Sequence, residues 1–277
     1  MTTLYEALFD LARKVDYVHK GSCTSDGTTS TIVDSALTVT FPDASIVPGI
    51  LFMPSRTVVT VQPDESRQVT AWTTPTMTIT PVLSAISKSG NPYYVCGPRF
   101  QHSQLVTAIN QALLAFGKIP LTATFAAVDD QEEYTTTDNA NLAKEIIMVE
   151  VAHDSAAPYD WQIHQGWQQI HPTAVSGNRT LKFDQDQAPS NTYNIRITYL
   201  DYHSEVTTDA GVIHHLVPRE WLSWAAAVEA WRTRAQITMG DEPISAVMFE
   251  DANKHYLMEN QKLNTINRQA TSRLSSL

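Results

Sequence analysis

Six histidines lie between residues 153 and 215, where their imidazole nitrogens could bind a metal ion. His214 and His215 are adjacent, and adjacent side chains point away from each other on a strand or a helix, so both rarely bind one ion. His164 and His171 would need a third ligand, such as Asp154 or Asp160, that folding brings near them. We therefore expect no bound metal and no cofactor, and ordinary surface or turn positions for His153, His164, His171, His203, His214 and His215.

Carboxylates form two further groups, at residues 129–133 and 184–186. Paired carboxylates can serve as the acid and base of a glycosidase, or they can bind Ca²⁺. The first group precedes three threonines in a turn-like stretch, and the second lacks the glycine and the final glutamate of a calcium loop. The sequence contains no nucleophile elbow and no phosphate-loop, dinucleotide-binding or zinc-protease motif. We expect solvated loops and no catalytic residues, so a hydrolase is only the third interpretation of the sequence.

The charge balance is acidic and sparse. The 277 residues include 29 Asp and Glu against 19 Lys and Arg, which gives a formal net charge of −10. Only 17% of the residues are charged, below the roughly 25% of an average soluble domain, and neutral Thr, Ser, Gln and Asn make up the difference. Affinity for phosphate comes from clustered Lys and Arg, so this chain is not expected to grip nucleic acid. Its neutral surface suits a protein whose faces are covered by neighbours, or an extracellular module.

Targeting signals are not apparent. The first ten residues carry Glu6 and Asp10 and no positive region before an apolar core, so we expect no secretory signal. No run of about 18 apolar residues occurs, so we expect no membrane-spanning helix and no membrane partner. In a reducing compartment, the two cysteines, Cys23 and Cys96, are expected to be free thiols.

Helix signals occur near the N-terminus and in the middle of the chain. Thr3 and Glu6 form a capping box, and leucines at helical spacing extend the helix to about Tyr17. Ser103 as N-cap and Gly117 as a left-handed stop delimit a second helix. Both are expected to bury one apolar face.

Short β-branched runs broken by Pro and Gly predict antiparallel strands in a sandwich or small barrel. The clearest run is 193–199, whose odd-numbered residues share one apolar face. We therefore expect an α+β fold, in which antiparallel β-sandwich or barrel modules combine with a helical bundle formed by the N-terminal, central and C-terminal helices. The expected segments are an N-terminal helix and loop (1–30), a Thr-rich β module (31–100), a central helix (101–119), a second β module (120–210) and a C-terminal helix pair with a tail (211–277).

The C-terminal part predicts two helices. Pro218 suits the first position of a helix, and Trp221, Trp224 and Trp231 fall on one stripe of the helix that follows. This stripe packs in the core or forms a groove between subunits, and both interpretations stay open. A longer helix is expected over 244–268, with a frayed tail after it.

The end of the chain is locally basic, although the whole chain is acidic. After Asn253, four cations stand against Glu259 alone, namely Lys254, Lys262, Arg268 and Arg273. Cations near the C-terminus of a solvated helix are favourable, which is one interpretation. The other is a docking tail that becomes ordered on a partner.

The order of these elements resembles a known family. The loop into 31–37, the Thr-rich β module, the helix around 108–113, the second β module and the helix pair that starts at Val217-Pro218-Arg219-Glu220-Trp221 are together similar to the head-to-tail adaptor proteins of tailed bacteriophages. These are also called neck or head-completion proteins. The resemblance covers nearly the whole chain, and its motifs are diffuse.

The resemblance implies a structural virion protein that is not an enzyme. It implies a homo-oligomeric ring of twelve copies at the head–tail junction, assembled in the host cytoplasm, with the portal protein above and tail or neck proteins below. Double-stranded DNA would pass through without sequence recognition. The helix from Pro218 would pack in the ring, and the tail after Asn253 would attach to the portal. The expected interface residues are Trp221, Trp224, Trp231, Arg219, Lys254, Tyr256, Lys262, Arg268 and Arg273.

Charge supports this interpretation in part. Carboxylates that line a channel repel phosphate within a Debye length of about 8 Å, and neutral Thr-rich faces suit contacts between subunits, where charge is depleted. The alternative function is a binding module, such as a tail or capsid decoration protein or a glycan-binding β-sandwich. It depends on Trp161 and Trp167, which are either core residues, part of a protein interface, or a platform on which a sugar stacks.

Overall fold

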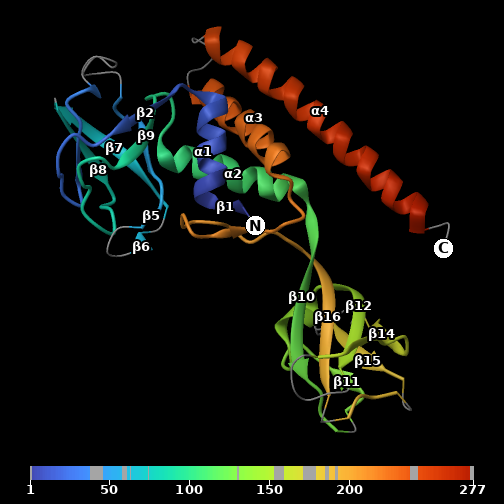
Figure 1. Cartoon of the computed structure of the whole chain (residues 1–277). Helices are drawn as coiled ribbons and strands as arrows, with labels where there is room; N and C mark the ends of the chain where they lie inside the picture. Colours follow the sequence, from blue (N-terminus) through green and yellow to red (C-terminus); the bar gives the residue numbers. More distant parts are fainter. Residues whose placement is uncertain are drawn as a thin grey trace. The chain divides into compact units, whose positions relative to one another are not determined.

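The chain folds into two compact units (Figure 1). Unit 1 consists of Met1–Phe116 and Ser204–Leu277, and unit 2 is Gly117–His203, inserted between them in sequence. The fold is α+β, as expected. The structure is a computed structural model that describes residues 2–37, 46–57, 61–62, 64–73, 75–129, 131–152, 159–170, 179–184, 187–190, 193–237 and 243–274. Within these ranges, the side chains of 56–57, 61–62, 243–245 and 266–274 are not described.

Six antiparallel strands of unit 1 form a sheet in the order β2-β9-β4-β7-β8-β3. The segment directly after β2 meets the other outer strand, β3, because Ser25 bridges to Val33 and the Thr24 N–H donates to the Val33 carbonyl at 2.8 Å. The sheet therefore closes into a small barrel, one of the two predicted alternatives. The strands are β2 (Val18–Ser22), β3 (Thr31–Val33), β4 (Ile50–Met53), β7 (Glu65–Thr73), β8 (Thr76–Thr80) and β9 (Pro92–Cys96).

Strand β4 joins the barrel to the helices. Its four residues are all buried, because successive side chains of a strand point to opposite faces. Leu51 and Met53 belong to the barrel core, and Ile50 and Phe52 to the core shared with the helices. A strand that is buried on both faces has an uninterrupted apolar sequence, and the sequence of β4, Ile-Leu-Phe-Met, is of this kind.

One polar pair lies inside the barrel. The Tyr93 hydroxyl donates to Asp34 at 2.7 Å, and both residues are buried. Burial, and then the bond to Asp34, raises the pKa of Tyr93. A Cβ at Gly21 would lie 2.3 Å from the Tyr93 ring, so the close approach of this ring requires glycine there.

Four helices complete unit 1, together with short strand pairs. Thr3 caps the first helix as predicted, because the Glu6 N–H donates to Thr3 Oγ1 at 3.3 Å and the Thr3 N–H to Glu6 Oε2 at 2.9 Å. Gly117 has φ +95°, which confirms the predicted stop of the second helix. The elements are α1 (Leu4–Val15), α2 (His102–Phe116), α3 (Arg219–Ile237), α4 (Pro243–Leu274), β1 (Thr2–Thr3) paired with β17 (Val212–Ile213), and β5 (Arg56–Thr57) paired with β6 (Val61–Gln62).

Two helix boundaries and one strand in the N-terminal segment differ from the predictions. Helix α2 begins at His102, so Ser103 lies inside its first turn and is not the N-cap. Helix α4 continues to Leu274, so the segment expected to fray from 267 is helical over most of its length. The N-terminal segment also supplies strand β2. The predicted break between the last two helices falls mainly on 238–242, outside the described residues.

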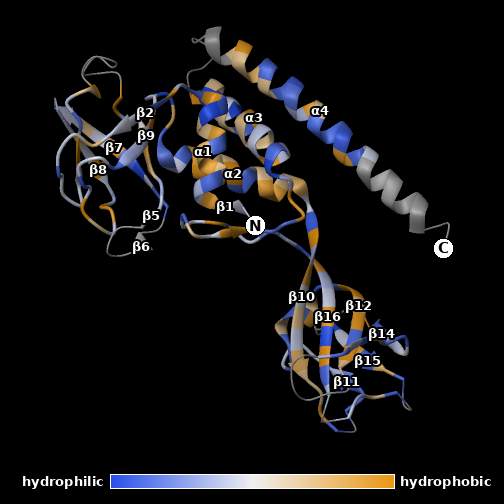
Figure 2. Cartoon of the chain, viewed as in Figure 1, coloured by the Kyte–Doolittle hydropathy of each residue, from blue (hydrophilic) through white to orange (hydrophobic). Residues whose placement is uncertain are grey.

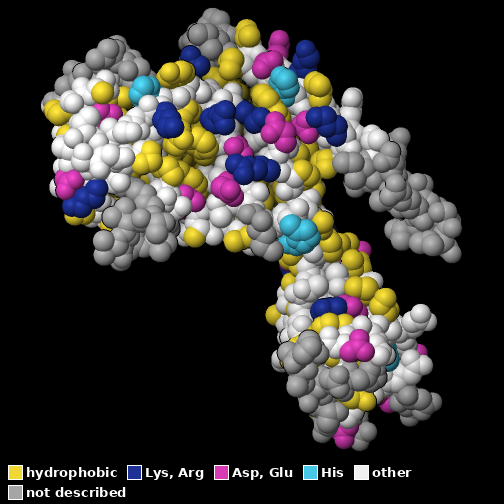
Figure 3. Space-filling view, viewed as in Figure 1, with side chains coloured by type: hydrophobic (Ala, Val, Ile, Leu, Met, Phe, Trp, Pro, Cys, Tyr) yellow, Lys and Arg dark blue, Asp and Glu magenta, His cyan; other side chains and the backbone are white. Residues whose placement is uncertain are grey.

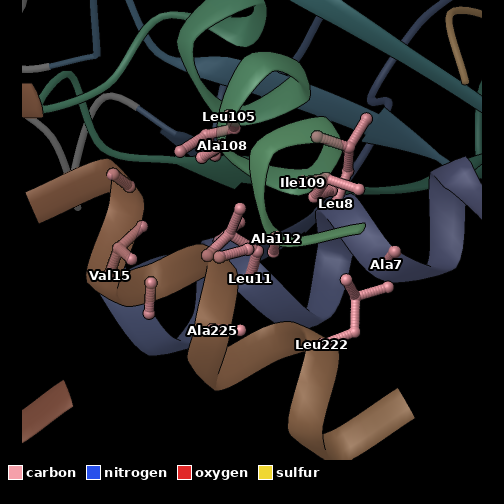
Figure 4. Packing of buried hydrophobic residues seen from close by; sticks show 14 of the residues in the cluster. Ala7, Leu8, Leu11, Val15, Leu105, Ala108, Ile109, Ala112, Leu222 and Ala225 are labelled. Atoms are coloured by element: carbon pink, nitrogen blue, oxygen red, sulfur yellow. The ribbon is translucent and has the colours of Figure 1, made fainter. Parts of the chain in front are cut away.

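Helices α1, α2 and α3 share one apolar core (Figure 4). Leu8 and Leu11 of α1, Ile109 of α2 and Leu222 of α3 are buried in it. Small residues such as Ala112 in this core let the helix backbones approach closely. Within the described residues, no helix combines the length and hydropathy that crossing a membrane requires.

Unit 2 is a sandwich of a four-stranded sheet, β10-β16-β12-β13, and a three-stranded sheet, β11-β15-β14. Ile195, Ile197 and Tyr199 lie on the buried face of β16, which confirms the predicted alternation. The elements are β10 (Lys118–Ala126), β11 (Glu133–Tyr134), the 3₁₀ helix η2 (Ala140–Ala143), β12 (Glu145–Ala152), β13 (Trp161–Ile163), β14 (Trp167–Ile170), β15 (Thr180–Phe183) and β16 (Asn194–Tyr202).

Candidate docking helix and its surroundings

Two of the three tryptophans expected at an interface lie in the core of unit 1. Trp231 is fully buried and meets Phe100 edge-on, with ring centroids 5.0 Å apart. Trp221 is 2% exposed and its indole N–H donates to Asn260 Oδ1 at 3.0 Å. Within one chain, α2, α4 and the segment before α2 therefore cover both residues, as the core interpretation of the stripe expects, and their role at an interface stays a prediction.

Trp224 is the half-buried member of the stripe. The Lys14 ammonium lies 3.9 Å from its ring centroid, and the His255 ring stacks on it at 4.3 Å and 12°. Glu220 accepts hydrogen bonds from Trp224 Nε1 at 2.9 Å and from Lys14 Nζ at 2.6 Å. The bond to Lys14 holds the pKa of Glu220 below its usual value. Trp224 thus connects α1, α3 and α4.

Arg219, also expected at an interface, is paired inside the chain. Its guanidinium donates to Asp10 and lies 3.4 Å from Glu6 Oε1. Figure 3 shows several Lys and Arg side chains on this face of unit 1 beside acidic ones. A hollow of about 420 Å³ lies here, lined by Asp10, Arg13, Lys14, Glu220 and Trp224. Because its wall carries both signs of charge, it does not present a field that selects a charged ligand.

The outer face of α4 is free in the described part of the chain. Figure 2 shows mainly hydrophilic residues along it, yet Val247, Leu257 and Met258 are 65%, 51% and 47% exposed. Lys254 is also exposed. The sequence analysis missed these three apolar residues, because they lie off the main apolar stripe of the helix.

Tyr256 and Lys262, both predicted at an interface, differ in environment. Tyr256 is half-buried and packs near Trp221, with centroids 5.9 Å apart. Lys262 is 63% exposed and is paired with Glu259 on its own helix. The side chains of Arg268 and Arg273 lie outside the described residues, although both positions are helical.

Helix α4 extends beyond the rest of unit 1 (Figure 1). It has 32 residues against 19 in α3, and the Trp221–Asn260 bond places Asn260 beside the start of α3. Leu263 is the last described residue of α4 that packs against the core. The eleven residues from Asn264 to Leu274 extend about 16 Å further at 1.5 Å per residue. No Asp or Glu follows Glu259 in the sequence, so this free end carries only positive charge.

A second polar site lies between β7, α2 and the segment before β17. Ser66 Oγ is 2.8 Å from His102 Nε2 and also bonds to Asp209. The carboxylate can only accept, so the single hydroxyl proton goes to Asp209 and His102 Nε2 donates its own proton to Ser66. His102 therefore cannot act as a base toward Ser66, which is also only 1% exposed. The trio is a structural network and not an activated nucleophile. Sequence reasoning missed it, because its members are far apart in the chain.

Arg67 completes this network. Its guanidinium donates to Glu65 Oε1 at 2.6 Å and to Asp209 Oδ2 at 2.8 Å. The three side chains are 14%, 7% and 16% exposed respectively. The Asp209 carbonyl also accepts from the Tyr5 N–H at 3.2 Å, so the network ties the segment that returns from unit 2 to both the barrel and α1.

We expect His102 to make the stability of the fold depend on pH. Burial lowers the pKa of His102 below its usual value of 6.5; nearby Asp209 opposes this and Arg67 adds to it. The unfolded chain takes up a proton near pH 6.5 and the folded chain does not, so stability is lost as the pH falls through that value. In urea unfolding between about pH 7.5 and 5.5, His102→Gln should show a shallower loss of unfolding free energy than the parent. Equal slopes would contradict the expectation.

The remaining candidate residues are described only in part. No group of His, Cys, Asp and Glu in the described residues is arranged to hold a metal ion, and His153, His171, Asp130, Asp154 and Asp186 lie outside those residues. Cys23 and Cys96 are buried and form no disulfide with each other, as predicted. Trp167 packs against the core of unit 2. The Arg196 guanidinium lies over the Trp161 ring at 4.4 Å, so a sugar would compete with it for that ring.

The negative charge is concentrated in unit 2. Residues 117–203 contain twelve Asp and Glu against five Lys and Arg, a net charge of −7, whereas unit 1 has seventeen against fourteen, a net charge of −3.

Comparison of the sequence with protein-family models and with curated proteins finds no match.

Proposed function

We propose that this chain is a structural subunit of a larger assembly, without catalytic activity. More particularly, we propose a head-to-tail adaptor of a tailed bacteriophage virion, which forms a homo-oligomeric ring between the portal and the tail or neck proteins and lets double-stranded DNA pass. The order of elements that carries the resemblance supports this proposal. The described hollows offer no activated nucleophile or metal cluster that would favour an enzyme.

The observation that carries the proposal is the free end of α4. Leu263 is the last described side chain of α4 that packs against the core, and the helix continues about 16 Å past it. The exposed apolar residues Leu257 and Met258 and the cation Lys262 precede this end, and Arg268 and Arg273 lie along it. Such a helix is suited to lie in an apolar, acidic groove of the portal.

The test is to remove the free end and measure attachment to the portal. A chain ending at Leu263 keeps Tyr256, Asn260 and Leu263, which contact the core, so its thermal unfolding should be unchanged. Its affinity for purified portal should fall at least about tenfold, or about 1.4 kcal/mol. Removal of residues 275–277 alone is the matched control and should have little effect. Full attachment of the shorter chain would refute the docking role of α4.

The second part of the proposal, the ring, is tested separately. Electron microscopy or native mass spectrometry of the chain bound to portal should show a fixed number of copies, and twelve is the expected number. A single copy per portal, or no complex, would contradict the adaptor function. In the same preparation, binding to glycans would favour the alternative of a decoration or binding module.

A further inference from the structure

The four-stranded sheet of unit 2 has two open edges. In the described part of the chain, β10 pairs only with β16, and β13 pairs only with β12. In the six-stranded sheet of unit 1, residues 24 and 25 bond to Val33 and so cover part of the β3 edge. In the other sheet of unit 2, the side chain of Gln169 in β14 bonds to the backbone of Leu142, Lys144 and Ile146, which occupies that edge.

The hydrogen-bond parity of β10 shows which of its groups are free. The Ala127 N–H donates to the Tyr193 carbonyl at 3.0 Å, and β10 pairs with β16 without a register shift. Odd-numbered residues therefore bond to β16, and the N–H groups of Thr122, Thr124 and Ala126 point to the open side. Pro120 is even-numbered, where a missing N–H is tolerated. These three N–H groups have no backbone acceptor among the described residues, and with the adjacent carbonyls they form a template for another strand.

The opposite edge follows the same rule. The His164 N–H donates to the Val149 carbonyl at 2.9 Å, so the N–H groups of Trp161 and Ile163 point away from β12. Each neighbouring pair in the sheet is antiparallel. With four strands, β10 and β13 therefore run in opposite directions. A β13 strand of one copy can consequently pair antiparallel with β10 of the next copy, and the contact can repeat from copy to copy.

Both edges lack charge, although unit 2 is strongly acidic. The two longest stretches of unit 2 without Asp, Glu, Lys or Arg are 119–128 and 161–178. The first contains β10 except its first residue, Lys118, and the second contains β13. Edge strands of monomeric proteins are usually protected by charges or bulges, and β10 has neither from Ile119 to Ala126. Large apolar side chains are exposed beside both edges, with Val128 at 50% and Ile163 at 66%.

We infer that copies of this chain associate head to tail through these edges, so that β13 of one copy and β10 of the next form a continuous antiparallel sheet. A second copy fits better than an unrelated peptide, because the two edges are complementary in direction and are both neutral and apolar. This inference deepens the proposed function, since it names a contact between copies in the ring. The self-association itself does not depend on the portal.

Two proline variants test the inference in the full chain. Thr124→Pro and Ile163→Pro each remove one outward N–H and leave the internal ladder bonded, as Pro120 already does. Analytical ultracentrifugation of the parent should show self-association that grows with concentration. Each variant should associate at least about tenfold more weakly, since outward backbone bonds are lost. A parent that stays monomeric at all concentrations, or variants that associate as the parent does, would overturn the inference.

Mixing the two variants is the sharper measurement. Thr124→Pro keeps an intact β13 edge and Ile163→Pro keeps an intact β10 edge, so the mixture should form dimers and nothing larger. If Ile163→Pro alone forms dimers, then β10 pairs with β10 about a two-fold axis, and the head-to-tail arrangement is wrong.

Amide hydrogen exchange of the parent tests the same contact without any substitution, so its result does not depend on whether the proline variants fold. On association, protection should increase at Thr122, Thr124, Ala126 and Ile163. Ala123 in the same strand is the internal control, because its N–H already bonds to β16. No gain in protection at the even-numbered residues would count against the inference. Rings on the portal that tolerate both prolines would refute the edge contact and leave the adaptor function standing, whereas edge association without portal binding would do the reverse.

Discussion

Replacement of Arg67 by methionine is expected to lower the free energy of unfolding by about 3–5 kcal/mol, the usual cost of removing one partner of a buried ion pair. Arg67 bonds to both Glu65 and Asp209, and all three side chains are largely shielded from water. Without the guanidinium, two carboxylates remain in this environment with no cation. Urea unfolding at neutral pH is the measurement, with the midpoint and slope compared between variant and parent.

The matched control is Arg232→Met, which removes the same side chain from an exposed pair with Glu229 on α3. Exposed pairs contribute less than about 1 kcal/mol, so this variant should unfold almost as the parent does. Arg67→Lys should fall between the two, because an ammonium group cannot reproduce the fork that contacts two carboxylates. Equal losses for Arg67→Met and Arg232→Met would contradict the account of a buried network.

Trp231→Ala is expected to cost about 3–5 kcal/mol, as for other large-to-small substitutions of buried aromatic residues. Trp231 is fully buried, and its contact with Phe100 links α3 to the segment before α2. Its indole N–H has no hydrogen-bond partner among the described atoms. Trp231→Phe removes this unsatisfied donor and keeps an aromatic ring, so it should lose clearly less stability. Thermal and urea unfolding of the two variants provide the comparison.

The two Trp231 variants also distinguish a role in the core of the subunit from a role at an interface with the portal. If Trp231 acts only within the subunit, Trp231→Phe should bind portal with the affinity of the parent under conditions in which the variant is folded. The corresponding control is Trp224→Ala on the same stripe. Trp224 is half-buried, so the loss of stability should be smaller than for Trp231→Ala. Weaker portal binding by a fully folded Trp231→Phe would show that the α3 stripe does reach a partner.

Local signals in the sequence were sufficient for several elements. The capping box at Thr3 and Glu6, the stop at Gly117 and the alternation along β16 each depend on residues a few positions apart. Such short-range geometry can be read from sequence because backbone sterics and side-chain periodicity determine it. The fold class followed from the same signals.

The environment of the candidate site could not be read in that way. The stripe of Trp221, Trp224 and Trp231 is periodic, but periodicity identifies a face and not what covers it. Here α2 and α4 cover most of it. The network of Ser66 and Asp209 joins residues 143 positions apart, and such pairings depend on the folded topology. The open edges of the unit 2 sheet likewise appear only when the strand order is known.

The insertion of unit 2 into unit 1 has a consequence for biosynthesis. Lys118 and Tyr202 are paired neighbours at the two ends of unit 2, so the sandwich is contiguous in sequence and is complete once residue 203 has been made. The core around Leu8 and Ile109 also contains Leu222, which is translated later. During synthesis, the sandwich can fold on the ribosome while α1 and α2 still lack α3. A chain stalled just after residues 117–203 have left the exit tunnel would thus carry a folded sandwich while α1 and α2 still lack a folded α3.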